Sequence, residues 1–269
     1  MTSVLLVGCG KMGGALLAGW RANNAADSFV VVEPMQQSLT DILGVPGVTV
    51  VKEVSEIPDD FKPNAIVMAV KPQAMNEVVP PYADLAKSAL TLSIAAGTPI
   101  AFFETIFGAD AAIVRAMPNT PAAIGRGMSV LCANAAASAS QKNLSEVLMQ
   151  ATGAVEWISD EGLMDAVTAL SGSGPAYVFH LIEAMAAAGQ ALGLDAELAA
   201  KAALETVAGA GELARQARET PSVLRQNVTS PGGTTAAALS VLMAENGMSK
   251  LIEKAMTAAR DRGRELASN

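Results

Sequence analysis

The sequence predicts an α/β fold in which an N-terminal Rossmann-type, doubly wound sheet precedes an all-α C-terminal dimerisation domain. Short apolar runs alternate with helical patterns up to about Asp160, as in a parallel sheet covered on both faces. A glycine-rich turn follows the first of these runs, and beyond Asp160 only helical patterns occur. We therefore expect a dinucleotide-binding domain over residues 1–159 and a helical domain over residues 160–269.

The first half contains eight strand-like runs and two clear helical patterns. The expected strands are 3–7, Phe29–Val32, Val48–Val51, Ala65–Val70, Leu90–Ala95, Ala112–Arg115, Gly127–Ala133 and Ala154–Ile158. The expected helices are Met12–Ala22 and Ser138–Ala151. The alternation of strands and helices predicts a parallel sheet.

The second half consists of helical patterns rich in Ala and Leu. They cover Leu163–Leu170, Pro175–Leu192, Ala196–Arg218, Ser222–Asn227, Thr235–Ala244 and Ser249–Ala267. Pro175 suits a first helical turn, Gly193 a C-terminal cap and Asp195 an N-cap. Because several of these helices are apolar around much of their circumference, we expect a partner subunit to bury a second face.

Composition excludes several classes of protein. The net charge is −8 and no block of Lys or Arg occurs, which argues against nucleic acid or an anionic membrane as partner. Apolar runs fall short of the ~20 residues that span a bilayer, and no signal peptide is evident, so we expect a soluble, cytoplasmic protein. One His and the two separated cysteines, Cys9 and Cys132, predict neither a metal site nor a disulfide scaffold.

The motif Gly8-Cys-Gly-Lys-Met-Gly13 lies between a predicted strand and a predicted helix. Its glycines allow a tight turn, close approach to a pyrophosphate and close packing of the helix on the strand, which predicts a dinucleotide site. Glu33 ends the second strand, where a carboxylate accepts hydrogen bonds from a ribose diol and repels the 2′-phosphate of NADP. A solvated Glu at a strand end is the alternative interpretation.

Two more segments lie at the predicted carboxyl edge of the sheet, Ala69–Pro72 and Ala95–Gly97. Small residues there let a cofactor lie against the backbone. Lys71 faces phosphate or ribose oxygens in one interpretation and only solvent in the other. Polar residues interrupt the pattern at Arg115–Pro121 and at Ser171–Tyr177. In one interpretation both segments contact a ligand, and Asn119 and Thr120 bridge the backbone to it. In the other interpretation both are only tight connections between elements.

The segment Asn227–Thr235 interrupts the helical half with a Pro, two Gly and several hydroxyls. Because a helical pattern resumes at Ala236, Gly232, Gly233 and Thr234 are expected at a helix N-terminus, where free backbone N–H groups favour an anion. The alternative is an ordinary Pro-Gly-Gly turn with a Thr N-cap.

Together these motifs resemble the pyrroline-5-carboxylate reductase family from end to end. The resemblance rests on Gly8–Gly13, Ala69–Pro72, Ser93–Gly97, Arg115–Pro121, Ser171–Tyr177 and, most specifically, Val228–Thr235. It implies reduction of 1-pyrroline-5-carboxylate to L-proline with NADPH or NADH, the last step of proline biosynthesis. It also implies a homodimer with interlocked helical domains, which assembles in some members into a decamer.

The resemblance also implies roles for individual residues. The expected cofactor contacts are Val7, Gly8, Cys9, Gly10, Lys11, Met12, Gly13, Glu33, Ala69, Val70, Lys71, Pro72, Ala95, Ala96, Gly97 and Asn227. Glu33 is included because of its position at the end of the second strand. The expected substrate contacts are Glu161, Ser230, Gly232, Gly233, Thr234 and Thr235. Lys11 stands where Asn or Gln is common, and Glu33 stands where NADPH-using members carry a phosphate partner, so a strict NADPH preference is not expected.

The reaction needs neither metal nor covalent nucleophile, because the cofactor supplies the hydride. Thr235 is the candidate catalytic residue, with its hydroxyl on the imine nitrogen of the substrate. The single histidine, His180, lies among apolar residues of a predicted helix, which favours a packed or partner-facing side chain over an acid.

Two rival functions remain at this point. The β-hydroxyacid dehydrogenase and imine reductase group shares both halves but requires a Lys on the first long helix of the second domain, and Pro175–Leu192 contains none. A non-catalytic NAD(P) sensor would have no need for the Val228–Thr235 segment.

Overall fold

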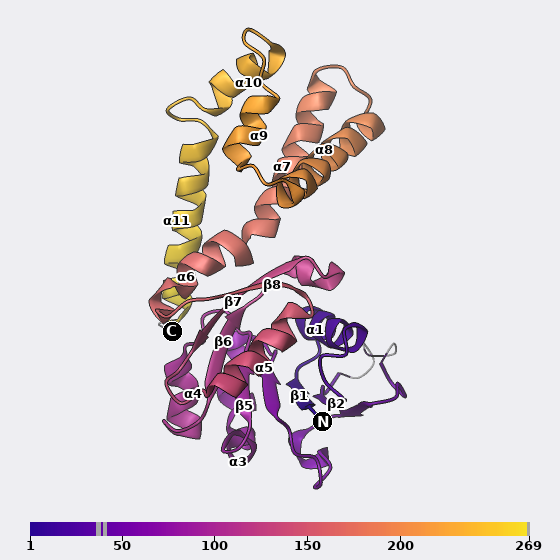
Figure 1. Ribbon diagram of the computed structural model, residues 1–269, viewed down its shortest axis with the longest axis vertical. Helices are drawn as coiled ribbons and strands as arrows, with labels where there is room; N and C mark the ends of the chain where they lie inside the picture. The colour runs from indigo at the N-terminus through magenta and orange to yellow at the C-terminus, as the bar shows by residue number, and fades with distance from the viewer. Residues whose placement is uncertain (36–38, 40–41, 268–269) are drawn as a thin grey trace. The chain divides into compact units, whose positions relative to one another are not determined.

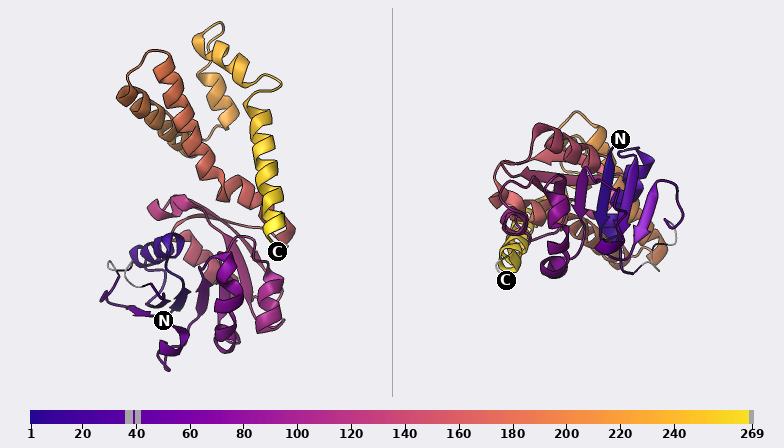
Figure 2. Two further views of the ribbon diagram at one scale, coloured as in Figure 1. Left: turned by 180° about the vertical axis from the view of Figure 1, so that it is seen from behind. Right: turned by 90° about the horizontal axis from the view of Figure 1, so that it is seen from below.

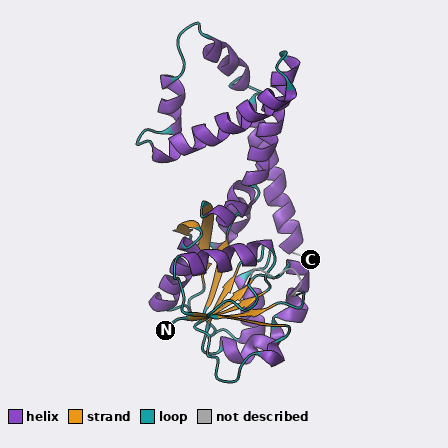
Figure 3. Cartoon of the chain, turned by 90° about the vertical axis from the view of Figure 1, so that its right-hand side faces the viewer, coloured by secondary structure: helices purple, strands orange, loops and turns teal. Residues whose placement is uncertain are grey.

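The computed structural model describes residues 1–35, 39 and 42–267. The chain divides into two compact units, each described here by itself. The first unit comprises Met1–Gly172 together with the end of the chain from Arg260, and the second comprises Ser173–Ala259. In the described residues the strands belong to the first unit, and the second is helical (Figure 3).

The first unit is built on an eight-stranded sheet, whose strands are drawn as arrows in Figure 2. Its strands are β1 (Ser3–Val7), β2 (Ser28–Val32), β3 (Val48–Val51), β4 (Ala65–Met68), β5 (Leu90–Ser93), β6 (Ile113–Met117), β7 (Gly127–Ala133) and β8 (Gly153–Trp157). They lie in the order β3-β2-β1-β4-β5-β6-β7-β8. The order reverses beside β1, and this is the switch point at which open α/β sheets bind ligands.

The prediction of a parallel sheet is correct from β3 to β6 but wrong for β7. β7 pairs antiparallel with β6 and parallel with β8. The segment between β6 and β7 is residues 118–126, which include the 3-10 turn η5 (Thr120–Ile124) and Gly125, whose φ is +68°. A parallel crossover needs a dozen or more residues, so this short connection returns the chain antiparallel.

Two apolar clusters cover the two faces of the sheet. Trp20 of α1 (Lys11–Ala22) and Leu148 of α5 (Ala139–Gln150) lie in one cluster (Figure 1). The Trp20 ring stacks on Phe29 at 6.0 Å between centroids, and its Nε1–H donates to the Leu148 carbonyl at 2.8 Å. The opposite face is covered by α2 (Met75–Val78), α3 (Ala83–Ala86), α4 (Ile100–Phe107) and α6 (Met164–Val167). Both faces are thus buried, as continuous apolar strands require.

Short turns connect these elements. They are η2 (Val54–Glu56), η3 (Pro72–Ala74), η4 (Pro80–Tyr82) and η6 (Glu161–Leu163), with a π-helical turn, η7 (Thr168–Gly172). The stretch Leu163–Leu170 is helical as predicted, but it is not one α-helix, because 3-10, α-helical and π-helical turns follow one another in η6, α6 and η7. Such π turns frequently occur at functional sites.

The second unit contains α7 (Gly174–Ala191), α8 (Ala196–Gln216), α9 (Pro221–Asn227), α10 (Thr234–Leu242) and α11 (Met248–Ala267), which extends into the first unit. The predicted caps are confirmed. Pro175 lies in the first turn of α7, Gly193 follows its end with a φ of +102°, and Asp195 Oδ1 accepts the Leu198 N–H at 2.9 Å.

Large apolar side chains of the second unit remain exposed. None of the described residues of α7 is buried, and Phe179 is 60% exposed. Leu213 of α8 and Leu251 of α11 are 59% and 66% exposed. A unit with so much exposed apolar surface fits the expectation that another subunit covers it.

Candidate functional site

A cleft of about 580 Å³ opens in the first unit at the carboxyl ends of β1, β4, β5 and β6. It is lined by Gly10, Lys11, Met12, Ala69, Val70, Lys71, Pro72, Ile94, Ala95, Ala96, Met117, Pro118, Asn119, Thr120 and Gly172. Most of the predicted cofactor residues therefore meet in one place. This edge of the sheet is where open α/β folds bind nucleotides.

The glycine-rich turn forms the floor of the cleft. Gly8 has a φ of +89° and donates its N–H to the Val32 carbonyl at 2.9 Å. A Cβ on Gly13 would lie 2.4 Å from the Gly8 carbonyl oxygen, so the start of α1 can pack on this turn only without a side chain there.

Gly10, in contrast, has open space around the position of a Cβ. It is the N-cap of α1, whose first N–H groups have no intrahelical acceptor. Open space beside free N–H donors at a helix N-terminus is what a pyrophosphate requires. The residues present therefore fit a dinucleotide.

Glu33 contacts the same turn. Its Oε2 accepts the Cys9 N–H at 2.9 Å, and its Oε1 accepts the Met35 N–H at 3.0 Å. The carboxylate is thus held beside the turn rather than in open solvent. Burial, followed by the charge of Glu33, raises the pKa of Cys9 to about 11, so this thiol is protonated at neutral pH.

The second wall of the cleft follows β4 and β5. The Ala69 N–H donates to the Val7 carbonyl at 2.8 Å, which extends the pairing of β4 with β1 into the wall. After β5, the buried Ser93 Oγ accepts the Ala95 N–H at 3.3 Å, and Gly97 turns the chain with a φ of +74°. Lys71 is exposed at the start of η3.

The wall that follows β6 was only partly expected. Asn119 and Thr120 were candidates among the turn formers, whereas Met117 and Gly172 lie within the two polar interruptions but were not singled out. Asn119 Nδ2 donates to the Ser171 carbonyl at 3.2 Å, and its Oδ1 accepts the Met128 N–H at 2.8 Å. Asn119 therefore joins three segments of backbone.

Glu161 is not among the residues that line the cleft. Its Oε1 accepts a hydrogen bond from Arg115 Nη1 at 2.9 Å and another from the Ile100 N–H at 2.9 Å. The Arg115 side chain is 7% exposed and that of Glu161 is 29% exposed. Burial, the largest cause, and the charge of Glu161 raise the pKa of the neighbouring Cys132 thiol, while Arg115 opposes this shift.

In the second unit, the segment Val228–Thr235 has the local structure that was predicted. Gly233 is the N-cap of α10, and its N–H donates to the Ser230 carbonyl at 3.0 Å. Gly232 makes the turn with a φ of +71°. Thr234 is exposed and Thr235 half-buried at the start of α10, and Asn227 is the last residue of α9.

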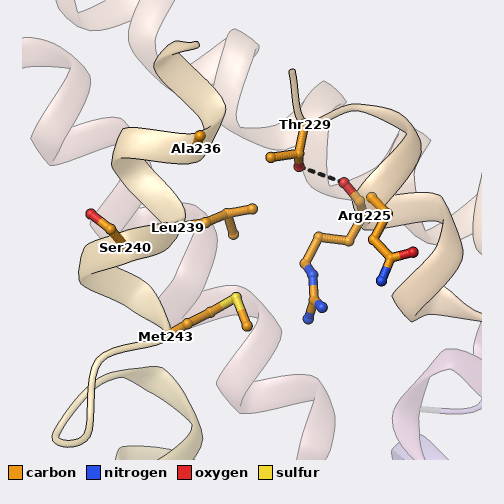
Figure 4. Close-up of a pocket in the computed structure, with 7 residues that line it drawn as sticks. Arg225, Thr229, Ala236, Leu239, Ser240 and Met243 are labelled. Carbon is orange, nitrogen blue, oxygen red and sulfur yellow. Dashed lines mark hydrogen bonds between the residues drawn. The ribbon is translucent and has the colours of Figure 1, made fainter. Parts of the chain in front are cut away.

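A groove of about 400 Å³ lies between α9 and α10, and Thr229 of this segment helps to line it. Figure 4 shows Leu239 and Met243 of α10 facing Arg225, and Thr229 Oγ1 donating to the Arg225 carbonyl at 2.6 Å. Its lining combines Ala236, Leu239 and Met243 with the polar residues Arg225, Gln226, Thr229 and Ser240. The groove is a surface feature that does not include Thr235.

His180 does not pack inside the chain. It is on α7 with its side chain 82% exposed, and its Nδ1 lies 3.2 Å from Glu183 Oε2. The prediction that His180 packs within its own chain is thus wrong, and its partner-facing position stays a prediction. In the residues that the structure describes, no helix is long and apolar enough to cross a membrane.

Comparison with known proteins gives two family matches. Residues 161–266 match the model for pyrroline-5-carboxylate reductase dimerisation, and residues 3–97 match that for NADP oxidoreductase, coenzyme F420-dependent. Pyrroline-5-carboxylate reductase from Pseudomonas aeruginosa is 41% identical over 98% of this chain and 96% of its own length.

Solved structures agree with these matches. A pyrroline-5-carboxylate reductase from Coxiella burnetii is 36% identical, with a TM-score of 0.91 and 98% of both chains covered. The enzyme from Plasmodium falciparum, with NADP bound, is 29% identical with a TM-score of 0.82 over 99% of this chain and 98% of its own. The chain therefore belongs to the pyrroline-5-carboxylate reductases, a family of NAD(P)H-dependent oxidoreductases.

Proposed function

We propose that this chain reduces the C=N bond of 1-pyrroline-5-carboxylate to give L-proline, the last step of proline biosynthesis, with NADPH or NADH as hydride donor. The observation that carries the proposal is the cleft at the switch point of the sheet, with open space and free N–H groups at Gly10. Family membership over nearly the whole chain supports the substrate. Residues 1–159 are the proposed cofactor domain, and residues 160–269 the proposed substrate-binding and dimerisation domain.

The cofactor is proposed to lie along the cleft. The first turn of α1 holds the pyrophosphate through backbone N–H groups, and Glu33 accepts hydrogen bonds from the adenosine ribose. The small residues Ala95 and Ala96 leave room for the nicotinamide end. The remaining predicted contacts, Val7, Gly8, Cys9, Gly13 and Gly97, shape the backbone around the cleft, and Asn227 is proposed as a contact from the second unit. Bound NAD(P)H supplies the hydride.

The substrate carboxylate is proposed to bind at the start of α10. Ser230 and Thr234 offer hydroxyl donors, and Gly232 offers a backbone N–H. Gly233, whose own N–H donates to the Ser230 carbonyl, keeps the start of the helix free of a side chain. Binding one end of the substrate firmly sets the imine carbon at reacting distance, which is the main contribution that a protein makes to such a transfer.

Thr235 is the proposed catalytic residue. Its hydroxyl donates to, or accepts from, the imine nitrogen and so keeps the proton there while the carbon is reduced. A cyclic imine arrives largely protonated near neutral pH, so a stronger acid is not needed. Half-burial of Thr235 at the N-terminus of α10 suits a group that must be both held and accessible.

The assembly is proposed to be a homodimer formed through the helical residues. The dimerisation model covers residues 161–266, and the exposed apolar side chains of α7, α8 and α11 lie within that range. A decamer of such dimers and a cytoplasmic location are finer proposals, which rest on the family resemblance alone.

The experiment compares NADH and NADPH oxidation side by side with 1-pyrroline-5-carboxylate, in the wild type and in Glu33→Ser. We expect turnover with both cofactors in the wild type and a smaller NADPH advantage than the family usually has. Replacing the carboxylate should raise the NADPH-to-NADH ratio of kcat/KM by about fivefold, as removal of ~1 kcal/mol of repulsion predicts. Absence of turnover with either cofactor would refute the assignment.

A further inference from the structure

A partly buried ion pair joins three segments of the first unit. Arg115 on β6 donates through Nη1 to Glu161 Oε1 at 2.9 Å, and the same oxygen accepts the Ile100 N–H at 2.9 Å. The three residues come from β6, from the start of α4 and from η6. One carboxylate oxygen thus serves donors from two other elements.

Each of the three segments continues into a wall of the cleft. Ile100 follows the loop whose Ala95 and Ala96 line it, and Arg115 lies just before Met117, which lines it as well. Glu161 begins the connection that returns to the cleft at Gly172. The Glu161 carboxylate is therefore bonded to two of the segments that continue into the cleft and belongs to the third.

No other described group takes over the hydrogen bonds that the Glu161 carboxylate accepts. The N-cap of α4 is Pro99, which provides no side-chain hydrogen bond, so Glu161 supplies the acceptor for the Ile100 N–H. A carboxylate there also complements the helix dipole. Arg115 is buried, so removing its partner would leave a buried positive charge without a counter-charge. The surrounding walls would then have to rearrange so that water can reach this charge.

We propose that Arg115 is a positioning residue of the cofactor cleft, and that it acts through Glu161 to hold the Ala95–Gly97 loop where the nicotinamide end binds. Glu161 then holds the loop, a role that differs from the substrate contact implied by the family resemblance. The inference rests on the proposed function for the identity of the ligand.

The experiment measures the Kd for NADPH by the change in cofactor fluorescence, without substrate, for Arg115→Met, Glu161→Gln and the double variant. We expect each single change to weaken NADPH binding about tenfold, which corresponds to ~1.4 kcal/mol. The double variant should bind about as weakly as either single variant, because the two side chains act as one unit. KM for 1-pyrroline-5-carboxylate at saturating NADPH should change much less.

The exposed pair Asp84–Lys87 provides a matched control. Its side chains are 93% and 70% exposed, so Asp84→Asn, Lys87→Met and their combination should leave the Kd for NADPH within about twofold of the wild type. Circular dichroism checks that each variant is folded. If Arg115→Met does not fold, Arg115→Lys keeps the charge but loses the guanidinium geometry, and we expect it to weaken NADPH binding about threefold.

Three results would overturn the inference. The first is a wild-type Kd in Glu161→Gln with a raised KM for 1-pyrroline-5-carboxylate, which would return Glu161 to the substrate. The second is multiplicative effects in the double variant, and the third is an unchanged Kd in a folded Arg115 variant. A wild type that binds NADPH but does not reduce 1-pyrroline-5-carboxylate would contradict the proposed function and leave this test valid.

Discussion

At the scale of single residues, one side chain, that of Glu33, both stabilises the glycine-rich turn and, in the proposed complex, affects the choice between NADH and NADPH. Glu33 accepts the Cys9 N–H and so stabilises the glycine-rich turn, while its charge faces the position of a 2′-phosphate in the proposed complex. Replacing Glu33 therefore changes both the stability of the turn and the repulsion of a 2′-phosphate. For this reason its effect is best measured as a ratio between NADH and NADPH, in which a general loss of cofactor binding cancels.

Thr235 permits a direct test of the proposed chemistry. We expect Thr235→Ala to lower kcat by more than tenfold, which corresponds to roughly 1.4 kcal/mol or more, because the imine nitrogen loses its hydrogen-bond partner. Steady-state kinetics at saturating cofactor measure it. Ser249→Ala is a matched control, since Ser249 is also the second residue of a helix, α11, and is exposed. Equal kcat values in wild type and Thr235→Ala would remove Thr235 from the mechanism.

Some residue contacts could be predicted from the sequence and others could not. The glycines at 8, 10 and 13 have a spacing that reflects local geometry, so their place in the turn was predictable. The bond between Arg115 and Glu161 spans 46 positions, and neither local pattern nor composition indicates it. Contacts of this kind arise from tertiary packing alone.

At the scale of elements, the start of α1 offers a test with an internal control. A methyl group on Gly13 would lie 2.4 Å from the Gly8 carbonyl oxygen, so Gly13→Ala should push the helix from the turn and cost about 1–3 kcal/mol of stability. NADPH binding should weaken as well, because the N-terminus of α1 moves.

The neighbouring Gly14 has open space around its Cβ position. We therefore expect Gly14→Ala to leave the turn intact and to stabilise the helix by up to about 1 kcal/mol. Urea denaturation of both variants measures the difference. A Gly13→Ala protein as stable as Gly14→Ala would contradict the close contact between helix and turn.

The elements also show where local patterns stop being informative. Strand positions followed from apolar runs, and the caps Asp195 and Gly193 followed from their chemistry. The direction of β7 did not, because an apolar run has the same appearance in parallel and antiparallel strands. The division of Leu163–Leu170 into three turns was also unpredictable, since its apolar period is helical throughout.

At the scale of the whole molecule, the exposed apolar surface of the helical unit predicts self-association. We expect the wild type to elute as a dimer at micromolar concentration in size-exclusion chromatography with light scattering. Phe179→Glu should shift it toward monomer, because the side chain is 60% exposed in the single chain and a charge would be costly to bury.

Val147 on α5 provides the control, since it is an exposed apolar residue of the first unit at 39%. Val147→Glu should leave the mass unchanged. A monomeric wild type would contradict the predicted dimer, and an unaltered dimer in Phe179→Glu would place the interface away from this part of α7.

The reversed strand β7 also sets how many cofactors one chain can hold. The carboxyl ends of β7 and β8 lie at the edge of the sheet opposite to the cleft, because β7 runs against β6 and β8 follows β7. The β7–β8 pair therefore brings no further strand carboxyl end to the cleft, and we expect a single cofactor site in each chain. Titration with NADPH should saturate at one equivalent per chain, so that a homodimer carries two.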